Sequence, residues 1–138
     1  PVDRYAQQLK NPKPEERDAA ISSLGALIAF GNKVAFQELL NFFRQAPPPK
    51  TIEEVHFKKE LLRHLKLTKQ KTALMRVLFK ELYTTPSNNT TRQWISAILD
   101  FLEYCPPEQV RKPLQKMLDE NLFSYRLKQK MKRILYGL

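Results

Sequence analysis

The sequence predicts an all-α fold in which pairs of helices stack into a short solenoid. The chain has only 3 glycines in 138 residues and few hairpin signals, while runs of Leu, Ala, Glu, Lys and Gln favour helix. Its 10 prolines fall mostly between helical stretches. Apolar residues recur at helical spacing, and a single helix pair cannot bury its apolar side alone. A compact irregular helical bundle is the alternative fold.

Proline, glycine and asparagine residues separate the first two helices and end the second. The first covers residues 2–10. The second begins at Pro14, a residue suited to the first helical position, and ends at Gly31-Asn32, which tolerate a left-handed backbone. Small side chains on the second helix should let a neighbouring helix approach closely. These small residues are Ala19, Ser22, Ser23, Gly25 and Ala26.

The third and fourth helices are separated by a run of prolines. The apolar stripe of the third runs over residues 34–43, and the helix stops at Ala46 and the prolines at 47–49. Thr51 followed by Glu54 predicts a capping box at the start of the fourth helix. We expect its core side to carry Val55, Leu61, Leu62 and Leu65, and its solvent side to carry Lys58, Lys59, Arg63 and Lys66.

Four further helices follow to the C-terminus. The fifth has its stripe over residues 74–82 and ends before Pro86, and one of residues 89–91 should cap the sixth. The seventh begins at Pro106-Pro107. Pro113 falls inside its apolar pattern, so it should either kink this helix or move the true start later. The eighth runs from about Phe123.

Pairing these helices around their turns gives a repeat of about 31 to 39 residues, with second helices beginning near positions 14, 52, 91 and 123. The first unit carries Asn11-Pro12-x-Pro14, Arg17, Ala19-Ala20 and Leu24-Gly25, and Arg92 and Arg126 stand at the equivalent early position later on. This pattern resembles a HEAT repeat. The resemblance implies one domain over residues 1–138, a right-handed solenoid of about four helix pairs whose second helices line the concave side.

The composition favours a soluble protein of a reducing, cytosol-like compartment. No apolar run approaches the roughly 18 residues needed to span a bilayer. The N-terminal residues lack the apolar core of a secretory signal, and the single Cys105 has no partner for an internal disulfide. A processed precursor is the alternative. We interpret Cys105 as a packing residue.

The sequence contains no motif of catalysis or cofactor binding. Gly-rich phosphate loops, CxxC pairs and GxSxG elements are absent. His56 and His64 lie eight residues apart on one helix, too distant to bind one metal together, and we interpret both as surface residues. We therefore expect no enzyme activity, no cofactor and no metal. The HEAT-like alkylpurine DNA glycosylases and bilin lyases give a lesser alternative, because no residue pattern here maps onto either.

The net charge of +10 and the pI of about 9.8 point to an anionic partner. Residues 51–84 carry 8 basic and 4 acidic residues, and residues 122–138 carry 5 basic residues and no acidic one. Because the resemblance places second helices on the concave side, their cations are the predicted partner-binding residues. These are Lys58, Lys59, Arg63, Arg92, Arg126, Lys128, Lys130, Lys132 and Arg133.

Four interpretations of this basic surface remain open from the sequence. We favour a non-enzymatic scaffold or adaptor that docks an acidic protein surface or helix. A sequence-nonspecific nucleic-acid-binding module is the second, with Trp94, Tyr125 and Tyr136 available for stacking. An anionic membrane surface facing the last helix is a third, weaker one. The fourth is a solvated face that serves solubility alone. No small-molecule substrate is evident.

Overall fold

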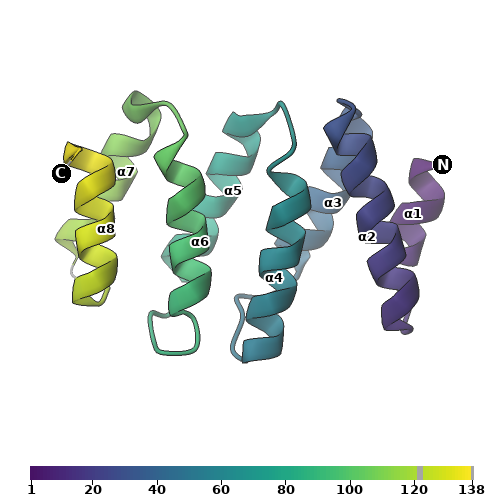
Figure 1. Ribbon diagram of the computed structural model, residues 1–138, viewed down its shortest axis with the longest axis horizontal. Coiled ribbons are helices and arrows are strands. Elements are labelled where there is room, and N and C mark those ends of the chain that lie inside the picture. Colours follow the sequence, from purple (N-terminus) through teal and green to yellow (C-terminus); the bar gives the residue numbers. More distant parts are fainter. Residues whose placement is uncertain (121–122, 138) are drawn as a thin grey trace. The chain divides into compact units, whose positions relative to one another are not determined.

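The protein has an all-α fold over the residues that the structure describes. The structure is a computed structural model, and it describes residues 1–120 and 123–137. Eight helices lie in these ranges, which contain no strand, and Figure 1 labels each of them. The helices are α1 (Val2–Gln8), α2 (Pro14–Ala29), α3 (Lys33–Gln45), α4 (Ile52–Leu65), α5 (Lys71–Thr84), α6 (Arg92–Glu103), α7 (Pro107–Asp119) and α8 (Tyr125–Tyr136). The predicted all-α class is confirmed, and the stacking of pairs into one array stays a prediction.

The first compact unit comprises Pro1–Pro47 and Phe57–Leu74, which hold α1, α2, α3 and most of α4. Helix α2 packs against both α1 and α3, and α1 also contacts α3. The core of the unit is apolar because α2, α3 and α4 each contribute a buried stripe. Its fully buried side chains include Leu24, Ile28, Leu39, Phe43, Leu61 and Leu65.

The second compact unit comprises Pro48–His56 and Met75–Leu138. Helix α8 packs against both α6 and α7. Trp94 of α6 is fully buried, and its Nε1 donates a hydrogen bond of 3.0 Å to Oε2 of Glu81 on α5. A buried indole N–H needs such an acceptor, so this bond ties α5 to α6.

Local capping chemistry sets several of the helix starts. At α4 the Thr51 amide donates to Glu54 Oε1 at 3.1 Å, and the Glu54 amide donates to Thr51 Oγ1 at 3.1 Å, so the predicted capping box is confirmed. The Asn32 side chain caps α3 through the Ala35 amide. Helix α2 ends at Ala29, and Gly31, just after its C-cap Phe30, has a φ of 91°, which explains why a glycine follows this helix end.

The structure decides where α7 begins and shows how the start of α6 is held. Helix α7 begins at Pro107 and continues through Pro113, so the suggested later start is wrong. Thr91 holds the cap position of α6, as predicted, but its hydroxyl donates to the Pro86 carbonyl at 2.6 Å instead of bonding the helix. Thr91 is buried, and its side chain therefore closes the preceding loop.

Candidate basic interface

The nine predicted partner-binding residues lie on three helices. They are Lys58, Lys59 and Arg63 on α4, Arg92 on α6, and Arg126, Lys128, Lys130, Lys132 and Arg133 on α8. Helix α4 is shared by the two compact units, whereas α6 and α8 belong to the second. The residues on α4 are therefore described separately from those on α6 and α8.

Lys58 is not on the solvent side of α4, and this part of the prediction is wrong. Its side chain is only 2 % exposed. The Nζ atom donates to the Phe43 carbonyl at 3.2 Å and to the Ala46 carbonyl at 3.1 Å, and it lies 4.0 Å from the centroid of the Phe43 ring. These carbonyls end α3, where a positive charge is stabilising. Lys58 is a structural cation.

Arg63 is exposed but is already engaged by its own helix. Its Nη2 and Nε atoms donate to the two carboxylate oxygens of Glu60 at 2.6 and 3.1 Å. This two-pronged contact raises the pKa of Arg63 and, mainly through the same hydrogen bond, lowers the pKa of the Glu60 carboxyl. An acidic partner would have to compete with Glu60 for Arg63. Lys59, beside it, is half-buried.

The prediction that both histidines of α4 lie on the surface is wrong for His64. His56 is exposed, whereas His64 is 8 % exposed. The Nε2 atom of His64 lies 3.2 Å from Glu60 Oε1, and its ring packs on Gly25 of α2. A Cβ atom at Gly25 would stand 2.1 Å from His64 Nδ1. The glycine thus provides the close approach that the small residues of α2 predicted, and the histidine ring fills it.

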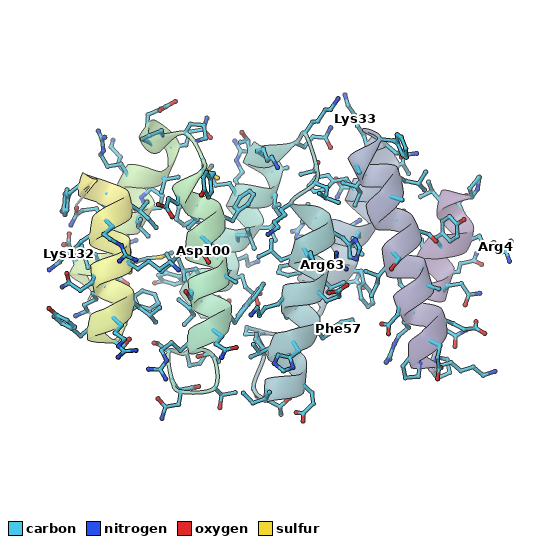
Figure 2. The ribbon with its side chains drawn as sticks, in the orientation of Figure 1. Arg4, Lys33, Phe57, Arg63, Asp100 and Lys132 are labelled. Atoms are coloured by element: carbon cyan, nitrogen blue, oxygen red, sulfur yellow. The ribbon has the colours of Figure 1, made fainter. Side chains whose placement is uncertain are left out.

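Helix α8 carries five cations and no acidic residue. Lys130 is the one that faces α6: its Nζ lies 2.5 Å from Asp100 Oδ1 and donates to Ser96 Oγ at 2.7 Å, and 18 % of its side chain is exposed. Figure 2 labels Asp100 on α6 and Lys132 on α8. Within the described residues the other four cations of α8 form no ion pair. They are Arg126, Lys128, Lys132 and Arg133, all at least partly exposed.

These four cations form two rows along α8, a helix that buries Leu127 and Met131 on its core side. Residues four, seven or eleven positions apart share one side of a helix. Arg126 and Arg133 therefore lie in one row, and Lys128 and Lys132 lie in another. A third row, Tyr125 and Tyr136, falls between them; these tyrosines are 77 % and 55 % exposed. We call these six residues the α8 face.

Arg92 of α6 extends the arginine row of the α8 face. Figure 1 shows that α6 and α8, which are in contact, run in the same direction. Lys130 bonds Ser96, and Arg126 and Arg92 each precede these two residues by one helical turn. Both arginines are exposed, so matching positions on neighbouring helices present two guanidinium groups to solvent.

Other kinds of site find little support in the described residues. In residues 1–120 and 123–137 no three His, Cys, Asp or Glu side chains are grouped so that they could hold a metal ion. None of the helices described is both long and apolar enough to cross a membrane. The basic α8 face, with Arg92 beside it, is therefore taken as the candidate interface of the second unit.

Comparison of the chain with protein-family models, with curated proteins and with solved structures found no match. The candidate interface therefore rests on its own geometry and charge.

Proposed function

We propose that the protein is a non-enzymatic adaptor built from HEAT-like helix pairs, and that the α8 face binds an acidic segment of another protein. The observation that carries the proposal is the charge of α8. Four exposed or half-exposed cations on one helix have no acidic neighbour on that helix and form no ion pair within the described residues. A partner rich in carboxylates would supply the missing counter-charges.

Arginine chemistry favours a carboxylate-bearing partner. Arg126, Arg133 and Arg92 have planar guanidinium groups that bind carboxylates through two parallel hydrogen bonds. Charge complementarity of this kind raises the association rate and selects the partner more than it raises affinity. The complex should therefore form quickly and weaken steeply as salt is added.

The experiment compares two charge-reversed variants of the full chain. One carries Arg126→Glu and Arg133→Glu on the α8 face. The matched control carries Arg4→Glu and Lys33→Glu, exposed residues of the first unit that change the net charge equally. The probe is a fluorescein-labelled polyglutamate peptide about as long as α8, followed by anisotropy at low and near-physiological salt.

We expect the Arg126/Arg133 variant to lose on the order of tenfold in affinity, about 1.4 kcal/mol, and the Arg4/Lys33 control to lose much less. Equal losses in the two variants would show attraction by net charge alone and would overturn the proposal. Absence of peptide binding to the unmodified chain at low salt would overturn it as well.

The exposed tyrosines of the α8 face favour a second candidate, sequence-nonspecific binding of single-stranded nucleic acid. Bases stack on exposed aromatic rings while cations follow the phosphates. Here a single-stranded oligonucleotide should bind more tightly than the peptide, Tyr125→Ala should weaken it, and affinity should fall steeply with salt. No retardation of the oligonucleotide at micromolar protein and low salt would exclude this candidate.

A further inference from the structure

Two exposed arginines lie at equivalent positions on neighbouring helices of the second unit. Arg92 is the first residue of α6, and Arg126 is the second residue of α8. Each stands four residues, about one turn, before a member of the Ser96–Lys130 hydrogen bond that joins the two helices. The two side chains therefore lie on adjacent stretches of α6 and α8. We call Arg92 and Arg126 the arginine pair.

A bonded lysine fixes the register of the arginine pair. Lys130 Nζ donates to Ser96 Oγ at 2.7 Å and lies 2.5 Å from Asp100 Oδ1, so one cation of α8 contacts two side chains of α6. The two helices are in contact, and the axes of packed helices lie about 8–10 Å apart. Because Lys130 opposes sliding of α8 along α6, the two long arginine side chains stay level with each other. Both guanidinium groups can therefore reach one ligand group placed between the helices.

No carboxylate of the described residues occupies the arginine pair. The first turns of α6 and α8 contain no acidic residue. Within the ranges that the structure describes, neither guanidinium group forms a hydrogen bond or an ion pair, whereas Arg63 is bound by Glu60. Two positive charges side by side repel each other, and an anion between them is attracted by both.

The chemistry of the arginine pair favours a phosphate group over a carboxylate. A carboxylate has two oxygens and one negative charge, and a single guanidinium group binds it through two parallel hydrogen bonds. A phosphorylated serine or threonine carries a charge of about −1.5 to −2 at neutral pH and three acceptor oxygens, so it accepts from two guanidinium groups at once. Clusters of arginines are a general means of recognising phosphorylated protein segments.

We infer that the arginine pair binds the phosphate of a phosphorylated serine or threonine carried by the acidic segment. The inference rests on the proposed function and specifies its partner. Arg133 lies seven residues, about 10 Å, beyond Arg126 along α8, so the phosphate and the flanking carboxylates contact different parts of the surface. Lys128 and Lys132 supply the remaining positive charge. Binding therefore depends on the phosphorylation state of the partner.

The test compares three fluorescein-labelled peptides of alternating Glu and Gly, each as long as the 12-residue α8. The first has a serine in place of one central glycine, and the second has phosphoserine there. The third has glutamate in place of that serine and of one further glycine, which matches the charge of the phosphopeptide. We expect the phosphopeptide to bind the full chain on the order of tenfold more tightly than either of the others, the gain of an added charge-assisted hydrogen bond. Equal binding of the phosphopeptide and the charge-matched peptide would overturn the inference.

Variants of the full chain locate the phosphate. Arg92→Gln with Arg126→Gln should abolish the gain from phosphorylation. Arg111→Gln with Lys112→Gln, exposed residues of α7, removes the same charge and should preserve the gain. Arg92→Lys with Arg126→Lys keeps the charge but not the planar fork of donors, so it should lose most of the gain. A gain that survives either change at the arginine pair, or that falls equally in the α7 control, would contradict the assignment.

Competition separates other sources of phosphate. Sodium phosphate, a single-stranded oligonucleotide and vesicles containing phosphatidylglycerol are each added to the complex with the labelled phosphopeptide. We expect each to displace it less well than the unlabelled phosphopeptide at equal phosphate concentration, because none combines a phosphate monoester with flanking carboxylates. Stronger displacement by the oligonucleotide or the vesicles would remove the phosphorylated protein segment as the partner.

The two proposals can fail separately. Acidic peptides that bind the unmodified chain and lose binding in the Arg126→Glu, Arg133→Glu variant, without any gain from phosphate, would leave the proposed function standing and remove the phosphate site. No binding of any of the three peptides at low salt would remove both proposals.

Discussion

At the scale of single residues, His64 shows how a polar side chain is placed inside a helix junction. Its ring occupies the space left by the missing side chain of Gly25, while Nε2 stays within 3.2 Å of Glu60 at the edge. The size of the side chain at position 25 therefore limits where the His64 ring can lie.

Gly25→Ala should destabilise the first unit. The new Cβ would stand 2.1 Å from His64 Nδ1 and 2.7 Å from its Cγ, so the ring or helix α2 must move. Overpacking of this kind costs about 1–3 kcal/mol in unfolding free energy. Urea denaturation followed by circular dichroism measures it, with Ser22→Ala as an exposed control on α2.

A double variant checks the cause. If the clash with His64 is responsible, adding His64→Ala to Gly25→Ala should recover part of the lost stability, a coupling that contacting residues show. Fully additive losses would point to a different origin.

The burial of Lys58 could have been foreseen from helical spacing, and its partners could not. Lys58 follows Val55 by three positions and precedes Leu61 and Leu62 by three and four, so it lies within the apolar stripe of α4. The charge of a lysine side chain predicts that Lys58 is exposed, whereas its helical spacing from Val55, Leu61 and Leu62 predicts that it is buried. The deciding carbonyls are those of Phe43 and Ala46 at the end of α3, 15 and 12 positions earlier in the chain, which no local pattern reveals.

At the scale of helices, α4 carries two carboxylates that the folded state holds ionised. The hydrogen bond from the backbone amide of Lys50 is the main cause of the lowered pKa of Glu54. The side-chain hydrogen bond from Arg63 is the main cause of the lowered pKa of Glu60. Both values lie below the usual 4.5. The contribution of these groups to stability is therefore present above that pH and lost as the pH falls through the lower folded-state values.

Acid should weaken the unmodified protein more than a Glu54→Gln, Glu60→Gln variant, compared between about pH 5 and pH 3. The difference should be modest, because both carboxylates are largely in contact with solvent. Urea midpoints at each pH measure it. The Glu53→Gln variant, changed in the same turn as Glu54, serves as control. The same acid response in the double variant and in the unmodified protein would contradict the assignment.

Helix bounds were the most predictable part of the fold because their causes are local. The capping box of α4 lies within four residues, and the end of α2 depends on a single glycine. The cap of α6 was harder to predict because the Thr91 hydroxyl bonds the loop carbonyl of Pro86, an alternative that the same sequence pattern allows. The partner of buried Trp94 lies 13 residues earlier, beyond any local pattern.

At the scale of the whole molecule, the excess of positive charge is the main feature of the sequence. The net charge of +10 is spread over 138 residues, so like-charge repulsion opposes the folded state. The basic stretches were visible in the sequence. Which cations are exposed was not, since Lys58 is buried and Lys130 and Arg63 have carboxylate neighbours.

Added salt should raise the melting temperature by a few degrees, because the screening length falls to about 10 Å at 0.1 M. Thermal melts at low and moderate sodium chloride measure the change. A variant with Lys10, Lys13 and Lys33 changed to Gln, all exposed, should show a smaller rise. A melting temperature that falls with salt would mean that ion pairs outweigh repulsion, contrary to the small contribution expected from exposed pairs.

The position of Lys58 also has a consequence for chemical reactivity. Reagents that acylate amines need a neutral amine open to solvent, and among the lysines of the described ranges Lys58 is the one that is buried. Its acylation must wait until α4 separates from the end of α3, whereas exposed lysines react at once. The rate at which this single amine is acylated would therefore report the rate of local opening of the first unit in the native protein.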